Sequence, residues 1–201
     1  MQQLGKTKLA PKAVPVPAPK PAPLSQPVIA TDLVPANADG TKLSTEQLWD
    51  LLQEVKDPEV PVVSVVELGI VRRLGWQDEQ LVVEVTPTYS GCPATELIEE
   101  LIAKAIKQAG IAQPLIKRVL NPAWTTDWIT AAGRDKLRQF GIAPPQGSSS
   151  KLSLLGIAEQ IQCPKCGSKH TEQVSEFGST ACKALYRCLS CQEPFDYFKC
   201  I

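Results

Sequence analysis

Thr86–Gly110 reads TPTYSGCPATELIEELIAKAIKQAG, and this stretch constrains how the rest of the chain can fold. After Pro93, apolar residues recur at helical spacing, while glutamates and lysines occupy the opposite side. This period predicts an amphipathic helix. Pro93 suits the first helical position, and Gly110 suits the stop. The apolar run that ends at Thr86 predicts a strand leading into this helix.

Cys92 would then be the N-cap residue of the helix. A thiolate there would face unpaired backbone N–H groups and the positive end of the helix dipole, which lower a thiol pKa and favour an anion or a metal. A single cysteine is also commonly a small, buried, inert residue. Spacing alone favours this second interpretation, so both hypotheses are carried forward.

Composition bounds the class of protein. The chain has 201 residues, which is enough for one ordinary domain and a small one. Its formal net charge is zero. Balanced charge gives no general electrostatic case for binding nucleic acid or a membrane. No apolar run approaches the roughly 20 residues of a membrane span, and no secretory signal is predicted. Seven cysteines, four of them in C-x-x-C pairs, indicate metal binding in a reducing compartment, so the cytoplasm is expected.

The N-terminal part divides into a tail and a folded start. Residues 1–42 are rich in proline, alanine and lysine, which predicts a disordered tail. Ser44 and Gln47 form a capping box before a short amphipathic helix. That helix ends at a proline-rich turn carrying Asp57 and Glu59. The turn is either an ordinary solvated one or a carboxylate-bearing loop beside Cys92.

The following segments predict the fold of the first domain. A β-branched run at 62–66 precedes a β-hairpin at 70–86, and residues 115–120 predict a third strand. Residues 134–140 predict a last short helix. The order helix, hairpin, helix, strand, helix predicts an α+β domain at 43–145, with helices covering one face of a small mixed sheet.

A second domain is predicted at 161–201, after a proline-, glycine- and serine-rich linker at 146–160. Its strands are expected at 170–175, 184–187 and 193–199. Two C-x-x-C pairs predict a zinc ribbon, because four thiolates on two tight turns build a tetrahedral site. An iron–sulfur cluster is the alternative occupant, since four cysteines suit both. The predicted ligands are Cys163, Cys166, Cys188 and Cys191.

Three further potential ligands lie in this second domain: His170, Cys182 and Cys200. Four cysteines already complete a structural zinc site, so these three are surplus to it. Each remains a possible substitute for one of the four.

Several motifs resemble those of a known family. They are Asp57-Pro58-Glu59, the VELGIV run at 66–71, the TPTYSGCP run at 86–93 and the PAW run at 122–124. Together they resemble the SUF-type, metal–sulfur cluster biosynthetic family of iron–sulfur assembly factors. Glu67 departs from the family, which usually has Asp there. The resemblance implies that Cys92 is the metal- or cluster-transfer thiol, with Asp57 and Glu59 in the associated loop.

Longer stretches at 122–130, 174–186 and 195–200 resemble the accessory subunits of bacterial phenylacetyl-CoA epoxidase systems, which add a C-terminal zinc ribbon. This resemblance covers about residues 43–201 and implies a role in aerobic phenylacetate degradation. The partners that it implies are a di-iron oxygenase and a reductase with a flavin and a [2Fe–2S] cluster. A homodimer is also open, while nucleic acid and membrane are not expected partners.

Three functions are therefore weighed. The first is a non-catalytic factor that passes iron or an iron–sulfur cluster transiently through Cys92, beside a structural Zn²⁺ in the ribbon. The second is a structural scaffold of the oxygenase complex. The third is a thiol-dependent enzyme using Cys92, which is weakened because the one histidine lies in the ribbon.

Overall fold

The computed structural model describes residues 43–145 and 160–199. The predicted tail at 1–42, most of the predicted linker and Cys200 lie outside the described residues. Among those that are described, no helix is long and apolar enough to cross a membrane.

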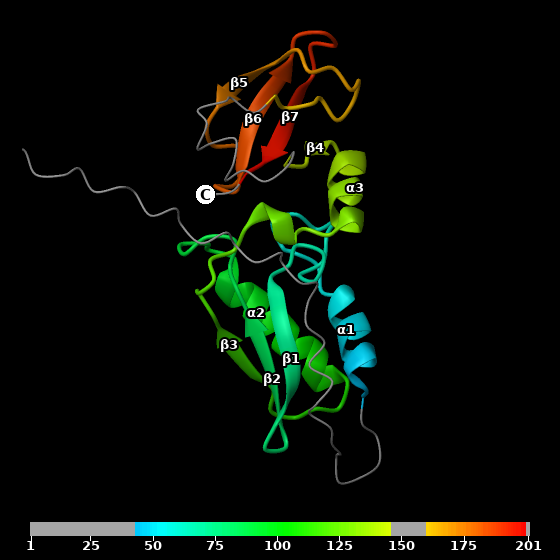
Figure 1. The fold of residues 1–201 in the computed structure, drawn as a ribbon, viewed down its shortest axis with the longest axis vertical. Helices are drawn as coiled ribbons and strands as arrows, with labels where there is room; N and C mark the ends of the chain where they lie inside the picture. The colour runs from blue at the N-terminus through cyan, green and yellow to red at the C-terminus, as the bar shows by residue number, and fades with distance from the viewer. Residues whose placement is uncertain (1–42, 146–159, 200–201) are drawn as a thin grey trace, which may run out of the picture.

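The fold is α+β, as predicted, and comprises two sheets (Figure 1). The first sheet has the strand order β1-β2-β3 and the second the order β4-β7-β6-β5. The elements, in chain order, are α1 (Thr45–Gln53), β1 (Val71–Gln77), β2 (Gln80–Val85), α2 (Thr95–Gln108), β3 (Leu115–Arg118), the 3-10 turn η1 (Thr126–Trp128), α3 (Ala131–Phe140), β4 (Ile142–Ala143), β5 (Thr171–Ser175), β6 (Lys183–Cys188) and β7 (Pro194–Phe198).

The predicted hairpin and third strand form the first sheet. β1 and β2 pair antiparallel through a two-residue turn at Asp78 and Glu79, whose φ angles of 45° and 67° suit a tight hairpin turn. β3 then joins β2 in parallel, which makes the sheet mixed. The parallel arrangement requires a crossover connection, and α2 provides it.

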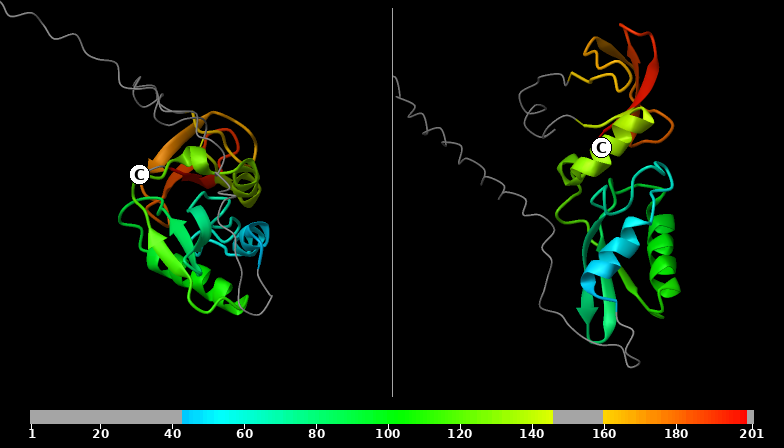
Figure 2. Two further views of the ribbon diagram at one scale, coloured as in Figure 1. Left: turned by 60° about the horizontal axis from the view of Figure 1, so that its bottom comes forward. Right: turned by 90° about the vertical axis from the view of Figure 1, so that its right-hand side faces the viewer.

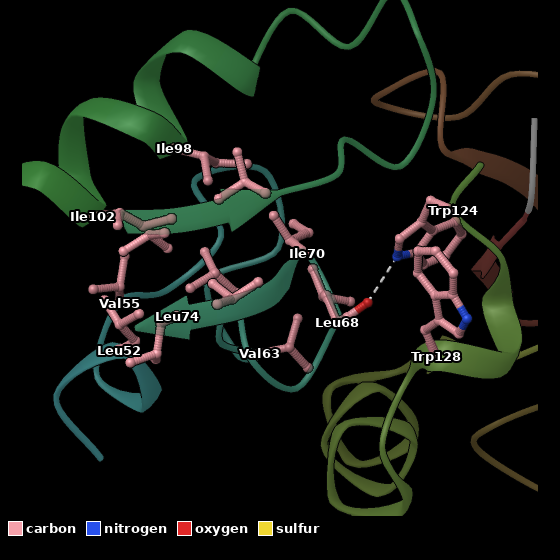
Figure 3. Close-up of a cluster of buried hydrophobic side chains, with 14 of the residues drawn as sticks. Leu52, Val55, Val63, Leu68, Ile70, Leu74, Ile98, Ile102, Trp124 and Trp128 are labelled. Carbon is pink, nitrogen blue, oxygen red and sulfur yellow. Dashed lines mark hydrogen bonds between the residues drawn. The ribbon is translucent and has the colours of Figure 1, made fainter. Parts of the chain in front are cut away.

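The hydrophobic core of the first domain lies between this sheet and the helices α1 and α2. α1 begins at the predicted capping box, in which Ser44 Oγ accepts from the backbone N–H of Gln47 and Gln47 Oε1 accepts from that of Ser44. Apolar side chains from both helices and the sheet meet in one buried cluster (Figure 3). Its members include Leu52, Val55, Leu74, Ile98 and Ile102.

The structure changes several sequence-based boundaries. The β-branched run at 62–66 forms turns, with one isolated bridge between Lys56 and Ser64. The valines of this run are core residues supplied by a loop and not by a strand, since Val63 and Val65 are fully buried there. α3 begins three residues earlier than predicted, because Thr130 Oγ1 caps it by accepting from Gly133 N.

Glu67 organises this loop from inside the protein. The side chain is 2% exposed, and Oε2 accepts from the backbone N–H of Ser64 at 2.9 Å, while Oε1 lies 2.5 Å from Lys136 Nζ. Burial acts to raise the pKa of Glu67, but the Lys136 and Ser64 hydrogen bonds outweigh it and lower the pKa. Glu67 thus ties the loop to α3.

The second sheet docks onto the first part of the chain. β4, which directly follows α3, pairs in parallel with β7, so the ribbon sheet includes residues from before the predicted linker. Figures 1 and 2 show the ribbon at one end of the molecule, with α3 beside the junction. Phe198 of β7 is 1% exposed and meets the Trp124 ring edge-on at 6.2 Å. Trp124 Nε1 in turn donates to the Leu68 carbonyl at 2.9 Å (Figure 3).

Gly69 is required where the loop passes the Trp128 backbone. Its φ of +69° is a left-handed conformation, and an added Cβ would lie 2.6 Å from Trp128 Cβ. We expect Gly69→Ala to lower the free energy of unfolding by about 3 kcal/mol or more, from left-handed strain and overpacking together. Gly110→Ala is the matched control, because Gly110 has φ +93° but open space around it, so about 1–2 kcal/mol is expected. If urea denaturation gave the same loss of unfolding free energy for both variants, the close approach of Gly69 to Trp128 would be contradicted.

Glu67→Gln tests the buried ion pair. Since the folded protein holds the pKa of Glu67 low, its contribution to stability is present above the ordinary glutamate pKa and is lost as pH falls through the lowered value. We expect Glu67→Gln to lower the free energy of unfolding by about 1–3 kcal/mol at neutral pH, and by less in acid. Asp135→Asn, which removes an exposed pair with Arg138, should cost less than about 0.5 kcal/mol. A loss for Glu67→Gln that is independent of pH would refute this assignment.

Candidate metal and thiol sites

Cys92 precedes α2 rather than capping it. The helix begins at Thr95 with Ala94 as its N-cap residue, so the predicted start at Pro93 and the predicted capping role of Cys92 are wrong. Pro93 and Ala94 form a turn first, in which the Cys92 carbonyl accepts from the backbone N–H and the hydroxyl of Thr95 at 3.2 and 2.9 Å. The thiol therefore belongs to the loop between β2 and α2.

The structure brings Cys92 together with Asp57 and Glu59. All three line one pocket at the junction of the first sheet, the start of α2 and the ribbon. The space open to the centre of a water-sized sphere is about 10 Å³, which is room for one water molecule or one ion. The remaining lining residues are Val60, Leu68, Ile70, Val85, Pro87, Thr88, Thr95, Ile98, Glu99, Cys182 and Phe198.

Asp57 and Glu59 have different positions in this pocket. Asp57 is buried, and its Oδ1 accepts from the backbone N–H groups of Glu59 and Val60, both at 2.8 Å. Burial raises the pKa of Asp57, against the opposing effect of these two hydrogen bonds. Asp57 therefore fixes the turn, and the turn places the half-buried Glu59 carboxylate at the pocket.

Cys182 is a pocket residue that sequence reasoning assigned to the ribbon alone. Its side chain is buried, with Sγ 3.6 Å from Glu59 Oε2 and 3.1 Å from Thr180 Oγ1. Burial raises the pKa of Cys182 to about 11, and Glu59 adds to this effect, so the thiol is protonated at neutral pH. The sequence offered one signal for this role, because Cys182 is not needed to complete the four-cysteine site. It could not show which part of the protein the Cys182 thiol faces.

Tyr89 lies beside the same groups. Burial raises the pKa of Tyr89, and Cys92, Glu59 and Cys182 all add to the shift, with Cys92 also hydrogen-bonded to the phenol. Both thiols and the carboxylate therefore contribute to the raised pKa of this one hydroxyl. Lys183 contributes a buried positive charge, with Nζ 3.9 Å from Asp196 Oδ2.

The two C-x-x-C pairs converge at the other end of the ribbon. The sulfurs of Cys163, Cys166, Cys188 and Cys191 all lie within 4.8 Å of one another. Two S···S distances are 3.8 and 3.5 Å, close to the ~3.8 Å edge of a tetrahedron with Zn–S bonds of about 2.3 Å. The four thiols therefore fit a tetrahedral metal ion of zinc size.

Each pair sits on a tight turn, and the residue directly after its second cysteine is left-handed. After the first pair, Gly167 has φ +75° and donates its N–H to the Cys163 carbonyl. After the second, Gln192 has φ +65° and donates to the Cys188 carbonyl in the same way. The predicted strands β5, β6 and β7 are confirmed, and they bring these two turns together.

Of the surplus residues, His170 and Cys182 lie apart from this cluster. Within the described ranges 43–145 and 160–199, no other cysteine, histidine or acid joins the four sulfurs. His170 is exposed, and its backbone contacts Ser168 Oγ and the Leu189 N–H. Cys182 faces the pocket instead. Cys200 lies outside the described residues.

Two family models match the chain. Residues 45–111 match an iron–sulfur cluster assembly protein, and residues 147–199 match the PaaD zinc beta ribbon domain. These matches correspond to the pocket-bearing part of the chain and to the four-cysteine part.

A curated relative from Escherichia coli (strain K12) is 50% identical over 155 residues, which is 77% of this chain and 92% of the relative. Its name, which is itself provisional, is that of a 1,2-phenylacetyl-CoA epoxidase subunit.

Solved structures resemble part of the chain. A domain of unknown function from Bacillus anthracis is 25% identical, with a TM-score of 0.43, over 46% of this chain and 89% of that one. A conserved hypothetical protein from Thermotoga maritima is 28% identical, with a TM-score of 0.41, over 48% and 95%. A Mycobacterium tuberculosis protein associated with [Fe-S] complex assembly and repair is 34% identical, with a TM-score of 0.30, over 54% and 98%.

The identity to the curated relative, the agreement of both family models and the four converging sulfurs point the same way. The chain belongs to the PaaD family of phenylacetyl-CoA epoxidase subunits, with an iron–sulfur cluster assembly domain followed by a zinc ribbon.

Proposed function

We propose that this protein is an accessory, non-catalytic subunit of a phenylacetyl-CoA epoxidase system in aerobic phenylacetate degradation. Its task would be to help load iron or an iron–sulfur cluster into the oxygenase or the reductase, in the cytoplasm. The observation that carries the proposal is the pocket in which Cys92 lies with Asp57 and Glu59.

This pocket has the properties that a transfer site needs. A thiol and a carboxylate can both ligate iron or zinc, and the half-buried Cys92 is open enough to meet a partner. In this site, Cys92 would hold the cargo, Glu59 would contribute an oxygen, and Asp57 would keep the turn in shape. An incomplete protein ligand set favours release, because a partner can supply the missing ligands.

The ribbon would play a different, structural role. Its four thiolates would hold Zn²⁺ in a closed tetrahedral set, leaving no ligand position for a substrate. Zinc there supplies folding energy to a small domain that has only a modest apolar core of its own. The ribbon would therefore act as the module that docks on the assembly domain and on partners.

A scaffold role is the second candidate, favoured by exposed apolar side chains on the ribbon. Val174 of β5 and the nearby Phe177 are each 56% exposed, which suits contact with another protein. A scaffold predicts stable co-purification with the oxygenase and no metal deficiency when Cys92 is replaced.

A thiol-dependent enzyme is supported less well. His170, the one histidine of the chain, is not among the described residues that line the pocket. Cys92 therefore lacks the imidazole base that activates most nucleophilic cysteines.

Metal content tests the ribbon assignment. We expect the anaerobically purified protein to contain about one Zn²⁺ per chain, because four cysteines form one closed site. Cys166→Ser should lose this zinc and lower the thermal stability of the ribbon. Cys182→Ser is the matched control and should keep it, since its sulfur lies outside the four-sulfur cluster. Elemental analysis that shows zinc loss in Cys182→Ser alone would overturn the assignment.

A chromosomal Cys92→Ser strain tests the loading function. We expect the oxygenase or the reductase purified from it to contain less iron than the wild-type component, with a matching loss of epoxidation activity. Ser90→Ala changes an exposed residue of the same loop and should leave partner iron unchanged. Fully loaded, active partners from the Cys92→Ser strain would refute a loading role for Cys92.

A further inference from the structure

Cys182 belongs to the ribbon by sequence but to the assembly domain by packing. It lies just before β6, yet its buried neighbours are those of the first domain's core cluster and not those of the ribbon core. The four ribbon ligands are complete without it. A buried thiol that the ribbon does not use therefore faces the pocket that contains Cys92.

We propose that Cys92, Cys182 and Glu59 together form one metal-binding site for a single divalent ion, shared between the two domains. This inference rests on the proposed transfer function and specifies its ligands. The ion would be a transition metal such as Fe²⁺, held by two sulfurs and one carboxylate oxygen.

Both domains fix the position of Cys182. Its carbonyl accepts from the backbone N–H of Lys199 at 2.9 Å, which joins the segment before β6 to the residue that follows β7. Phe198 anchors β7 in the first domain against Trp124. The thiol is therefore held at the junction by packing, and it reaches Glu59 without any movement of the ribbon.

The local charges suit a cation ligated by thiolates. Glu59 already lies 3.6 Å from the Cys182 sulfur, so the oxygen and one sulfur are adjacent. Glu59 and both thiols each add to the raised pKa of Tyr89, which is consistent with the pocket that the three groups line. Binding would displace the thiol protons to solvent, and the resulting thiolates would neutralise a divalent ion.

The pocket has room for one ion. About 10 Å³ is open to the centre of a water-sized sphere, which is enough for a single ion or water molecule. The three ligand atoms are not yet within 4.8 Å of one another, a condition met among the described residues by the ribbon sulfurs alone. The proposed site therefore requires the half-buried Cys92 and Glu59 side chains to move closer to each other and to Cys182 when the ion binds.

A site divided between domains provides a route to release. If a partner displaced the ribbon from the first domain, Cys182 would leave with it, and the ion would keep Cys92 and Glu59 alone. Loss of one thiolate would lower the affinity at the moment when the partner is in contact.

Cobalt binding tests the shared site. The full-length, zinc-loaded protein is titrated with Co²⁺ without oxygen, and thiolate-to-cobalt charge-transfer absorption is recorded while zinc content is checked to remain constant. We expect one Co²⁺ per chain. Cys92→Ser and Cys182→Ser should each halve the absorption per bound ion and weaken binding at least about tenfold. Glu59→Gln should weaken binding with unchanged absorption per ion, and the exposed-site control Glu96→Gln should behave as the wild type does.

The wild-type protein supplies an independent measurement that does not depend on how the variants fold. X-ray absorption of its bound Co²⁺ should show two sulfur neighbours, and fewer than two would overturn the shared site. Wild-type Co²⁺ binding by Cys182→Ser, or no thiolate absorption in the wild type, would do the same. None of these three results bears on the loading role of Cys92, which is decided by the iron content of the partners purified from the Cys92→Ser strain.

Discussion

The contact of Trp124 with Leu68 and Phe198 holds the two parts of this protein together. The indole N–H donates to the Leu68 carbonyl, and the ring meets Phe198 edge-on. A buried aromatic residue of this kind supplies a large apolar area and a directional polar bond at once. Because Leu68 and Phe198 also line the pocket, the same contact that joins the domains builds its wall.

The cysteines divide into two sets with different chemistry. Four lie on tight turns and converge with tetrahedral spacing, which favours a permanently bound ion. Cys92 and Cys182 lie on separate segments, one half-buried and one buried, beside a carboxylate. A closed set of thiolates holds a metal firmly, whereas the shared site that we propose would be assembled from two domains and could release its ion.

Buried charge near the pocket is balanced locally. Asp57 satisfies one carboxylate oxygen with two backbone N–H groups, and Lys183 lies near Asp196. Glu67 is paired with Lys136 below the same loop. Since burying unpaired charge is costly, these partners offset the cost of burying the charged side chains around the loop.

The sequence alone determined the elements and the ribbon. The spacing of apolar residues, together with a capping box and turn residues, predicted the hairpin, the helices and the ribbon strands. These signals could be read from the sequence because each acts over only a few residues. The C-x-x-C spacing likewise predicted the four cysteines whose sulfurs converge. Glu67 was visible only as a departure from a motif, and its burial against Lys136 came from the structure.

The tertiary structure decided what the pocket contains. The sequence placed Cys92 at a helix cap, but Pro93 and Ala94 form a turn first, so α2 starts at Thr95. It also assigned Cys182 to the ribbon, which is correct along the chain, although its thiol faces Glu59 of the other domain. Contacts between residues more than a hundred positions apart depend on how the domains dock, and no local pattern encodes that.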